Sequence, residues 1–361
     1  MAEVVAGVEA SPVARGLAGR EALPPVSSLR GWFQIGWSVD FGSGQPRPMR
    51  YFGQDLVGYR AESGELIVLD AICRHLGAHL GFGGAVEGDC IVCPFHGWKW
   101  NRDGANVDIP YSAKLRRNRA KRLRSWSVRE QEGVVYLWHD PCGGTPTWEP
   151  PLLLEETERY HDLHPDGVWT WERVRVHPQM SMENTADAAH FKYVHRAEDI
   201  GHIAAVRTDE RLFEAEYALG MGRGDRGTFL AGGSGVVLAR LMARAWGVGL
   251  LTAHFSGPGS AVNLLCTTPI DAHSSRMMSS VWVPRSVDAA VVGPRVREQV
   301  KQIGRDIVIW EHMDYLPRPP FPPEEARDFV ALRKWSEQFY VGHGTDLDHL
   351  GGRRADREGR D

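Results

Sequence analysis

The pattern of apolar and polar positions divides the chain into two β-rich halves. In the first half, short apolar runs over 56–59, 66–70 and 134–138 are separated by turns that contain glycine or serine,. This pattern predicts a compact antiparallel β unit. Closely spaced prolines then mark a linker near residues 142–152,.

The second half predicts another antiparallel sheet, together with two helices. Strands are indicated over 168–176, 261–267 and 278–284, and helices near 183–197 and 293–313,. The later helix has an apolar stripe at helical spacing, made of Val296, Val300, Ile303, Ile307 and Trp310,. The stripe predicts that one face of this helix is buried.

Composition is that of an ordinary globular protein with room for two cores. The 361 residues are 42% apolar and 24% charged, and 42 basic against 46 acidic residues give a net charge of −4,. This balance argues against nucleic acid as the main partner. The five cysteines form no even disulfide framework, which favours a reducing cytoplasm,.

No segment is long and apolar enough to predict a membrane span. Residues 1–28 lack a sustained apolar run, so they fit neither a signal peptide nor an anchor, and we expect a mobile tail,. The most apolar later segment, 235–255, is interrupted by Arg240 and Arg244,. It is predicted to be sheet that lines a core or a pocket.

Two short cysteine–histidine pairs, Cys73-x-His75 and Cys93-x2-His96, carry the first candidate chemistry. Two such loops can offer two thiolates to one iron and two imidazoles to another, as in a Rieske [2Fe-2S] cluster. Zinc is the alternative, because Cys90-x2-Cys93 is a possible half-site,. The pairing of C-x-H with C-x2-H and the apolar residues around His96 favour the cluster.

A second constellation is Asp187-x2-His190-x4-His195. The two histidines lie about 140° apart on an ideal helix, so they need a distorted turn to meet at one ion. A carboxylate could join them from the later helix. Asp306 borders the apolar stripe, where an acid is costly unless it is paired or binds a metal. Asp314 is the second candidate.

The chain resembles the oxygenase components of Rieske non-heme iron oxygenases over residues 30–342. The segments Cys93-Pro-Phe-His-Gly-Trp-Lys-Trp100 and Ile109-Pro-Tyr111 are most similar to the ketosteroid 9α-hydroxylase-like monooxygenase branch. The resemblance implies an α+β fold. An antiparallel β Rieske domain (29–148) would precede a helix-grip catalytic domain (149–342) with a curved antiparallel sheet, and residues 343–361 would be a mobile tail.

The resemblance also implies roles for individual residues. Cys73, His75, Cys93 and His96 would bind the [2Fe-2S] cluster. Mononuclear Fe(II) would be held by His190, His195 and a carboxylate, for which the family's similar Asp-x2-Ile-Trp context favours Asp306 over Asp314 and over Glu311,.

Asp187 would bridge His190 to His96 of a neighbouring subunit, which implies a homotrimer. Its alternative role is that of a helix-capping or solvated acid.

Electrons must come from outside the chain, because no flavin or nicotinamide site is evident. The pattern Gly222-x-Gly224-x2-Gly227 lacks the strand–turn–helix context of a dinucleotide site,. We therefore expect an NAD(P)H-dependent reductase, acting directly or through a ferredoxin. The basic run 114–124 is either a solvated surface or a docking surface for an acidic donor,.

The expected function is that of the terminal oxygenase component of a multicomponent monooxygenase, which uses O2 to hydroxylate a bulky, steroid-like or polycyclic apolar substrate. Natural-product tailoring by N-oxygenation, demethylation or desaturation is an alternative, as is an electron carrier without oxygenase activity. Four residues could line an adaptable pocket or belong to the core: Met180, Met182, Met242 and Trp246,.

Overall fold

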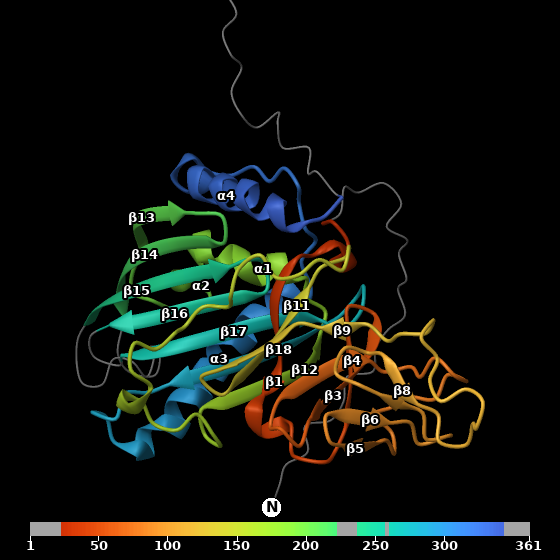
Figure 1. Ribbon diagram of the computed structural model, residues 1–361. Coiled ribbons are helices and arrows are strands. Elements are labelled where there is room, and N and C mark those ends of the chain that lie inside the picture. Colours follow the sequence, from red (N-terminus) through yellow and green to blue (C-terminus); the bar gives the residue numbers. More distant parts are fainter. Residues whose placement is uncertain (1–22, 222–236, 257–259, 343–361) are drawn as a thin grey trace, which may run out of the picture.

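The computed structural model describes residues 23–221, 237–256 and 260–342 and arranges them as two β-rich units (Figure 1). Each strand segment predicted from the sequence overlaps an observed strand. The glycine pattern at 222–227 and the tail at 343–361 lie outside the described residues. Within the described ranges, none of the helices combines the length and apolar character needed to cross a lipid bilayer.

The N-terminal unit contains three antiparallel sheets. Their strand orders are β2-β3-β4-β9, β5-β6-β7-β8 and β1-β11-β10. The strands are β1 (Gly31–Trp37), β2 (Arg47–Tyr51), β3 (Gln54–Arg60), β4 (Leu66–Asp70), β5 (Ala85–Glu87), β6 (Cys90–Val92), β7 (Lys99–Trp100), β8 (Asn106–Asp108), β9 (Ser125–Trp126), β10 (Val128–Gln131) and β11 (Val134–His139). β1 and β11 are buried along their whole length, as expected for strands covered on both faces,.

The C-terminal unit is one seven-stranded antiparallel sheet with helices packed against it. The strand order is β12-β18-β17-β16-β15-β14-β13. The strands are β12 (Val168–Val174), β13 (His202–Thr208), β14 (Leu212–Met221), β15 (Val237–Trp246), β16 (Leu250–Ser256), β17 (Ala261–Pro269) and β18 (Ser275–Trp282). The helices are α1 (Pro178–Glu183), α2 (His190–Tyr193), α3 (Val292–Trp310) and α4 (Pro323–Ser336). The predicted pocket-lining sheet over 235–255 corresponds to β15 and β16.

Helix α3 lies on the sheet, as its apolar stripe predicted (Figure 1). Ile303, Ile307 and Trp310 are buried in one cluster with Leu265 of β17. Apolar contact of this kind contributes about 1.5–3 kcal/mol for each fully buried large side chain. Packing of this stripe therefore fixes which face of α3 looks toward the sheet.

The two units are joined by hydrogen bonds as well as apolar packing. The Trp37 indole donates to Ser280 Oγ at 2.9 Å, and the Thr268 hydroxyl donates to the Gln34 carbonyl at 2.6 Å. The Phe52 amide donates to the Pro269 carbonyl at 2.8 Å. Because these bonds connect β1 and the β2–β3 turn to β17 and β18, the N-terminal unit packs against these two strands of the large sheet.

Two sequence-based expectations were wrong. The N-terminal tail does not extend to residue 28, because Val26 and Ser28 of a 3-10 helix over Val26–Ser28 are buried and Leu29 pairs with Tyr340. The helix expected near 183–197 is also broken. It consists of α1, a 3-10 turn over Asn184–Ala186, an extended residue at Asp187 and the short α2.

Candidate active site

Two loops of the N-terminal unit present the cysteine–histidine pairs and share one backbone geometry. In each loop, the cysteine carbonyl accepts a hydrogen bond from a glycine amide four residues later, and the cysteine amide donates to a carbonyl five residues later. The bonds are Gly77 N to Cys73 O (3.0 Å), Gly97 N to Cys93 O (3.0 Å), Cys73 N to Ala78 O (2.9 Å) and Cys93 N to Trp98 O (2.9 Å). Gly77 and Gly97 both have positive φ, 81° and 70°, a region that favours glycine,.

The side chains of these loops face one another. The His75 and His96 rings lie 4.7 Å apart at 73°, and Nδ1 of each ring is buried without a hydrogen-bond partner among the described residues. Cys73 and Cys93 are 1% and 3% exposed, and burial raises the pKa of the Cys73 thiol to about 11. Unpartnered buried nitrogens are rare in proteins. Two of them beside two buried thiols fit the donor set of a [2Fe-2S] cluster.

The alternative zinc half-site is not assembled. Cys90 lies on β6, where Cys90 and Val92 are half-buried and Ile91 between them is fully buried. Successive strand residues point to opposite faces, so Cys90 faces away from the side on which Cys93 is buried.

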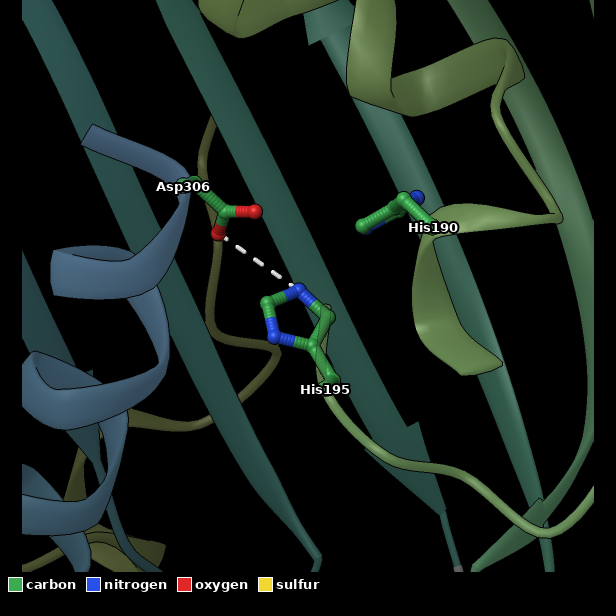
Figure 2. Close-up of side chains that lie close together, drawn as sticks. All are labelled: His190, His195 and Asp306. Carbon is green, nitrogen blue, oxygen red and sulfur yellow. Dashed lines mark ion pairs between the residues drawn. The ribbon is translucent and has the colours of Figure 1, made fainter. Parts of the chain in front are cut away.

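The second constellation brings together three residues from distant segments. His190, His195 and Asp306 offer ligand atoms that all lie within 4.8 Å of one another. Figure 2 shows the two imidazoles projecting from the α2 segment toward the Asp306 carboxylate on α3. His195 Nε2 is 3.5 Å from Asp306 Oδ2.

A distorted turn lets histidines five positions apart face one site. After His190, the Val194 amide donates to the His190 carbonyl at 2.7 Å, and the His195 amide donates to the same carbonyl at 3.4 Å. The second bond spans five residues, as in a π-turn, and it rotates His195 back toward His190. The distorted turn expected from the spacing is therefore present.

Asp187 orients His190. Its carboxylate Oδ1 accepts from the His190 amide at 3.0 Å, and its backbone carbonyl is 2.7 Å from His190 Nδ1. The carboxylate itself is 3.8 Å from Nδ1, so the backbone carbonyl is the hydrogen-bond acceptor,. Nδ1 then carries the proton and Nε2 is free to bind a metal. Burial lowers the pKa of His190, but Asp187 together with Asp306 raises it overall.

His195 is held from its other side by α3. Its Nδ1 lies 3.2 Å from Gln302 Oε1, which directs Nε2 toward Asp306. Arg305 also donates to Gln302 Oε1, at 3.0 Å. Burial, with the nearby His190, lowers the pKa of His195 to about 3. The imidazole is thus kept neutral, the form that binds metals.

Asp306 is a buried acid, and no cationic side chain in the described part of the chain is bonded to it. Burial raises its pKa to about 7, while His190 and a hydrogen bond from Asn184 act in the opposite direction. A buried carboxylate beside two imidazoles is costly unless a metal neutralises it. Two histidines and one carboxylate on one side of a cavity fit a non-heme Fe(II) site.

The other acids considered from the sequence do not join this group. Glu311 Oε1 accepts a hydrogen bond from the Arg175 amide at 3.0 Å, and Asp314 is exposed. Among the described residues, the metal-binding geometry includes Asp306 and neither of these two.

Comparison with known families matches the chain in two parts. Residues 31–126 match the Rieske [2Fe-2S] domain, and residues 137–340 match the 3-ketosteroid 9alpha-hydroxylase C-terminal domain. The second match alone spans more than half of the chain. The chain belongs to the Rieske oxygenases of the 3-ketosteroid 9α-hydroxylase family. It is therefore an oxidoreductase that carries a Rieske [2Fe-2S] cluster and a mononuclear iron.

Relatives with related activities support this membership over nearly the whole chain. A 3-ketosteroid-9-alpha-monooxygenase oxygenase component of Rhodococcus rhodochrous is 31% identical, covering 88% of this chain and 85% of the relative. A cholesterol 7-desaturase of Hemicentrotus pulcherrimus is also 31% identical, over 91% and 73%. Dicamba monooxygenase bound to dicamba has the same fold, with a TM-score of 0.66 and 18% identity over 88% of this chain and 98% of that one.

In this Rieske oxygenase, the three candidate iron ligands open into a cavity between α3 and the sheet. The cavity contains about 1130 Å³ of space that no protein atom fills, including its opening to solvent. Its wall is largely apolar and is formed by residues that include Phe191, Leu241, Ala243, Leu251, Ala253, Phe255, Leu265, Val281, Ile303 and Trp310. A large apolar cavity with a few polar groups is typical of a small-molecule site.

Four residues considered as pocket lining do not line this cavity. Met180 and Met182 are buried in the core, and Trp246 packs against another core cluster. Met242 lies on β15 between Leu241 and Ala243, which do face the cavity, so strand alternation turns Met242 to the opposite face,. The structure supports the core interpretation for Met180, Met182 and Trp246, whereas Met242 is half-buried on the other face of the sheet.

Sequence reasoning missed the polar residues of α3 that face the cavity. Arg295, Glu298, Gln299 and Gln302 share this face with Ile303 and Asp306. The signal was available, because these positions recur at helical spacing from Asp306.

Proposed function

We propose that this Rieske oxygenase is the terminal oxygenase component of a multicomponent monooxygenase that hydroxylates a bulky, steroid-like or polycyclic apolar substrate. The observation that carries the proposal is the group of His190, His195 and Asp306 at the wall of a large apolar cavity. The curated relatives that act on 3-ketosteroids add support for the substrate class.

Each candidate residue has a distinct role in this proposal. Cys73, His75, Cys93 and His96 hold the [2Fe-2S] cluster. His190, His195 and Asp306 hold the mononuclear iron, which supplies the activation of dioxygen when it is bound. The protein's own contribution is to fix the imidazole tautomers, to exclude water with the apolar wall and to orient the substrate beside the open side of the metal.

We place the electron transfer between subunits of a homotrimer. Figure 1 draws β5 and β6, which adjoin the cluster loops, on the side of the molecule away from α2. The rim of these loops carries exposed apolar side chains, Leu76, Phe82, Phe95 and Tyr111, each above 60% exposed. Exposed apolar patches mark interaction surfaces. Asp187, whose side chain is 26% exposed, would connect His190 to His96 of the neighbouring subunit.

The electrons would come from an NAD(P)H-dependent reductase, acting directly or through a ferredoxin. The basic run 114–124 offers a docking surface for an acidic donor. Six of its cations form no ion pair within the described part of the chain: Lys114, Arg116, Arg117, Arg119, Lys121 and Arg122. Arg124 differs, because its guanidinium stacks over Trp126 at 3.6 Å.

The proposal divides the chain into a Rieske domain over 29–148 and a catalytic domain over 149–342. It also places the protein in a reducing cytoplasm, in keeping with the free cysteines Cys73, Cys90, Cys93, Cys142 and Cys266,.

The test is turnover of the purified holoenzyme. It would be incubated with a reductase, NADH and a panel of steroids, polycyclic aromatics and amines, and products would be identified by mass spectrometry with ¹⁸O2. Incorporation of one labelled oxygen atom into a steroid or polycycle supports the proposal. NADH-dependent reduction of the cluster without any product would favour an electron carrier instead.

Desaturation is a second candidate activity, because one close relative is a cholesterol 7-desaturase. The same experiment separates the two activities. A desaturase product loses two hydrogens and gains no labelled oxygen.

A further inference from the structure

The cavity contains a polar end opposite its iron end. Helix α3 runs along the cavity and lines it with residues from Asp306 back to Arg295. At 1.5 Å of rise per residue, these two positions are about 16 Å apart along the helix axis. The sheet residues that pack against α3 differ between these two ends. Leu265 packs with Ile303 and Trp310, while Ala261 packs with Val292 and Val296 near Arg295.

Arg295 has an unused donor in this cavity. Its Nη1 donates to the Ser260 carbonyl at 2.8 Å, but its Nε is buried and has no hydrogen-bond partner among the described residues. Arg295 also forms no ion pair within that part of the chain. A buried guanidinium N–H without an acceptor costs free energy. Burial accordingly lowers the pKa of Arg295.

Asn263 supplies a second unpartnered group on the facing wall. It lies on β17, is 5% exposed, and its side-chain carbonyl oxygen has no partner among the described residues. It stands in one cross-strand row with Ala253 and Val281, which also line the cavity. The row is otherwise small and apolar, so Asn263 is an isolated polar group on this wall.

Two neighbouring polar residues of α3, Glu298 and Gln302, are already engaged. Glu298 accepts a short hydrogen bond from Gln302 and lies 3.5 Å from Lys301 Nζ. Gln302 in turn contacts His195. Among the described residues that line the cavity, the buried side-chain atoms without a hydrogen-bond partner belong to Arg295, Asn263 and Thr185. Thr185 directly follows Asn184, which bonds to Asp306 at the iron end, so Arg295 and Asn263 are the ones available away from the iron.

We propose that Arg295 and Asn263 form a polar anchor that binds an oxygen acceptor, a ketone or a carboxylate, at the end of the substrate remote from the oxidised carbon. Arg295 donates to this oxygen, and Asn263, whose amide can turn to present its N–H to the cavity, donates a second hydrogen bond. The anchor sets which carbon of an elongated apolar substrate lies beside the iron. This inference rests on the proposed function and adds to it the residues that determine specificity and regiochemistry.

The test measures substrate binding without turnover. Dissociation constants of the anaerobic holoenzyme would be obtained from quenching of tryptophan fluorescence, for which Trp310 in the cavity wall is a reporter. The probes are androst-4-ene-3,17-dione, the two analogues that each lack one ketone, and a 3-oxo steroid with a 17-carboxylate. The variants are Arg295→Met and Asn263→Leu, with Arg297→Met on the exposed face of α3 as the matched control.

The expected result is selective. Wild-type protein binds one mono-ketone about tenfold or more tighter than the other, and Arg295→Met abolishes this preference. Asn263→Leu reduces it, and Arg297→Met leaves it unchanged. Tighter binding of the carboxylate than of the dione, lost in Arg295→Met, identifies an acid as the natural group.

Two outcomes overturn the inference in different ways. If wild-type protein oxidises steroids but Arg295→Met keeps the same preference between the mono-ketones, the anchor is wrong and the proposed function stands. If wild-type protein neither binds nor oxidises any steroid on the panel, the proposed substrate class is wrong and the anchor falls with it. The absorption spectrum of the cluster checks that each variant is folded.

Discussion

Gln302 Oε1 lies 3.2 Å from Nδ1 of His195, a residue 107 positions away in the chain. Through this contact, helix α3 positions both ring nitrogens of the His195 imidazole. Asp306 stands on the Nε2 side, and Gln302 fixes the proton on the Nδ1 side. Hydrogen bonds of this kind orient histidine ligands and strengthen metal binding.

Substitution Gln302→Leu is expected to weaken iron binding about 10- to 100-fold, because His195 loses the acceptor that fixes its tautomer. Gln302→Glu keeps an acceptor oxygen at this position and should retain the iron. The measurement is mononuclear iron per [2Fe-2S] cluster after titration with Fe(II) under anaerobic conditions. Unchanged iron affinity in Gln302→Leu would show that the contact has no role in metal binding.

Asp306→Ala should empty the mononuclear site and leave the cluster intact, because the remaining two imidazoles offer only a partial ligand set. Asp314→Ala is the matched control on the same segment, and we expect it to retain iron. Metal analysis and the visible spectrum of the cluster check both. Iron retained in Asp306→Ala and lost in Asp314→Ala would reverse the assignment.

The sequence predicts those parts of the site that depend on residues close together in the chain. The cysteine–histidine spacing and the apolar stripe beside Asp306 are each visible within a few turns of chain. The break at Asp187 is not, because the alanines around it favour helix. There the carboxylate caps the His190 amide, and the Tyr217 hydroxyl donates to the Thr185 carbonyl at 2.6 Å. Tertiary contacts of this kind override local preference.

If the basic run 114–124 docks an acidic electron donor, the rate at which the donor reduces the cluster should depend on salt. Complementary charge accelerates encounter at low ionic strength, and salt screens it over about 10 Å at 0.1 M. The rate of cluster reduction by an acidic ferredoxin should therefore fall as NaCl rises, and the slope should flatten in a variant with Arg116, Arg117 and Arg119 replaced by Ser. Arg285→Ser, on the catalytic unit, is the control. A wild-type rate that is independent of salt contradicts docking through this run.

The buried side chain of His139 should make the folded protein less stable at acidic pH. It is 1% exposed, and burial lowers its pKa from 6.5 to about 4 in the folded protein. Between pH 6.5 and 4, the unfolded chain binds a proton at this histidine that the folded chain does not bind. The free energy of unfolding therefore decreases as the pH is lowered through this window, by about 3 kcal/mol at most from this residue. His139→Phe keeps an aromatic ring against Phe52, where the two rings stack at 3.8 Å, and removes the titrating group.

The measurement is the melting temperature of both proteins at pH 7, 6 and 5. The melting temperature of His139→Phe should lie below that of wild type at pH 7, and this difference should become smaller as the pH is lowered. His273→Asn, at an exposed position, should follow the wild-type curve in parallel. A deficit that is constant from pH 7 to 5 would rule out a role for His139 in this acid sensitivity.

A buried ion pair links α4 to the segment that precedes the iron ligands. Arg333 Nε and Nη2 donate to the two carboxylate oxygens of Glu183 at 2.9 and 2.8 Å, and both residues are under 10% exposed. Removal of one partner leaves the other charge buried and unpaired, which typically costs about 3–5 kcal/mol. Arg333→Met should therefore lower the denaturant midpoint strongly. Lys334→Met, which removes an exposed cation from the same helix, should change it little,.

The ion pair also bears on the metal site, because Glu183 directly precedes Asn184, whose side chain bonds to Asp306. Arg333→Met should consequently lose mononuclear iron at denaturant concentrations well below its unfolding midpoint, whereas wild type should release iron only as it unfolds. The double variant Glu183→Leu/Arg333→Met removes both charges and should recover much of the stability. If it recovers the midpoint but not the iron, the pair positions Asn184 in addition to stabilising the fold; if neither variant releases iron early, the pair acts on stability alone.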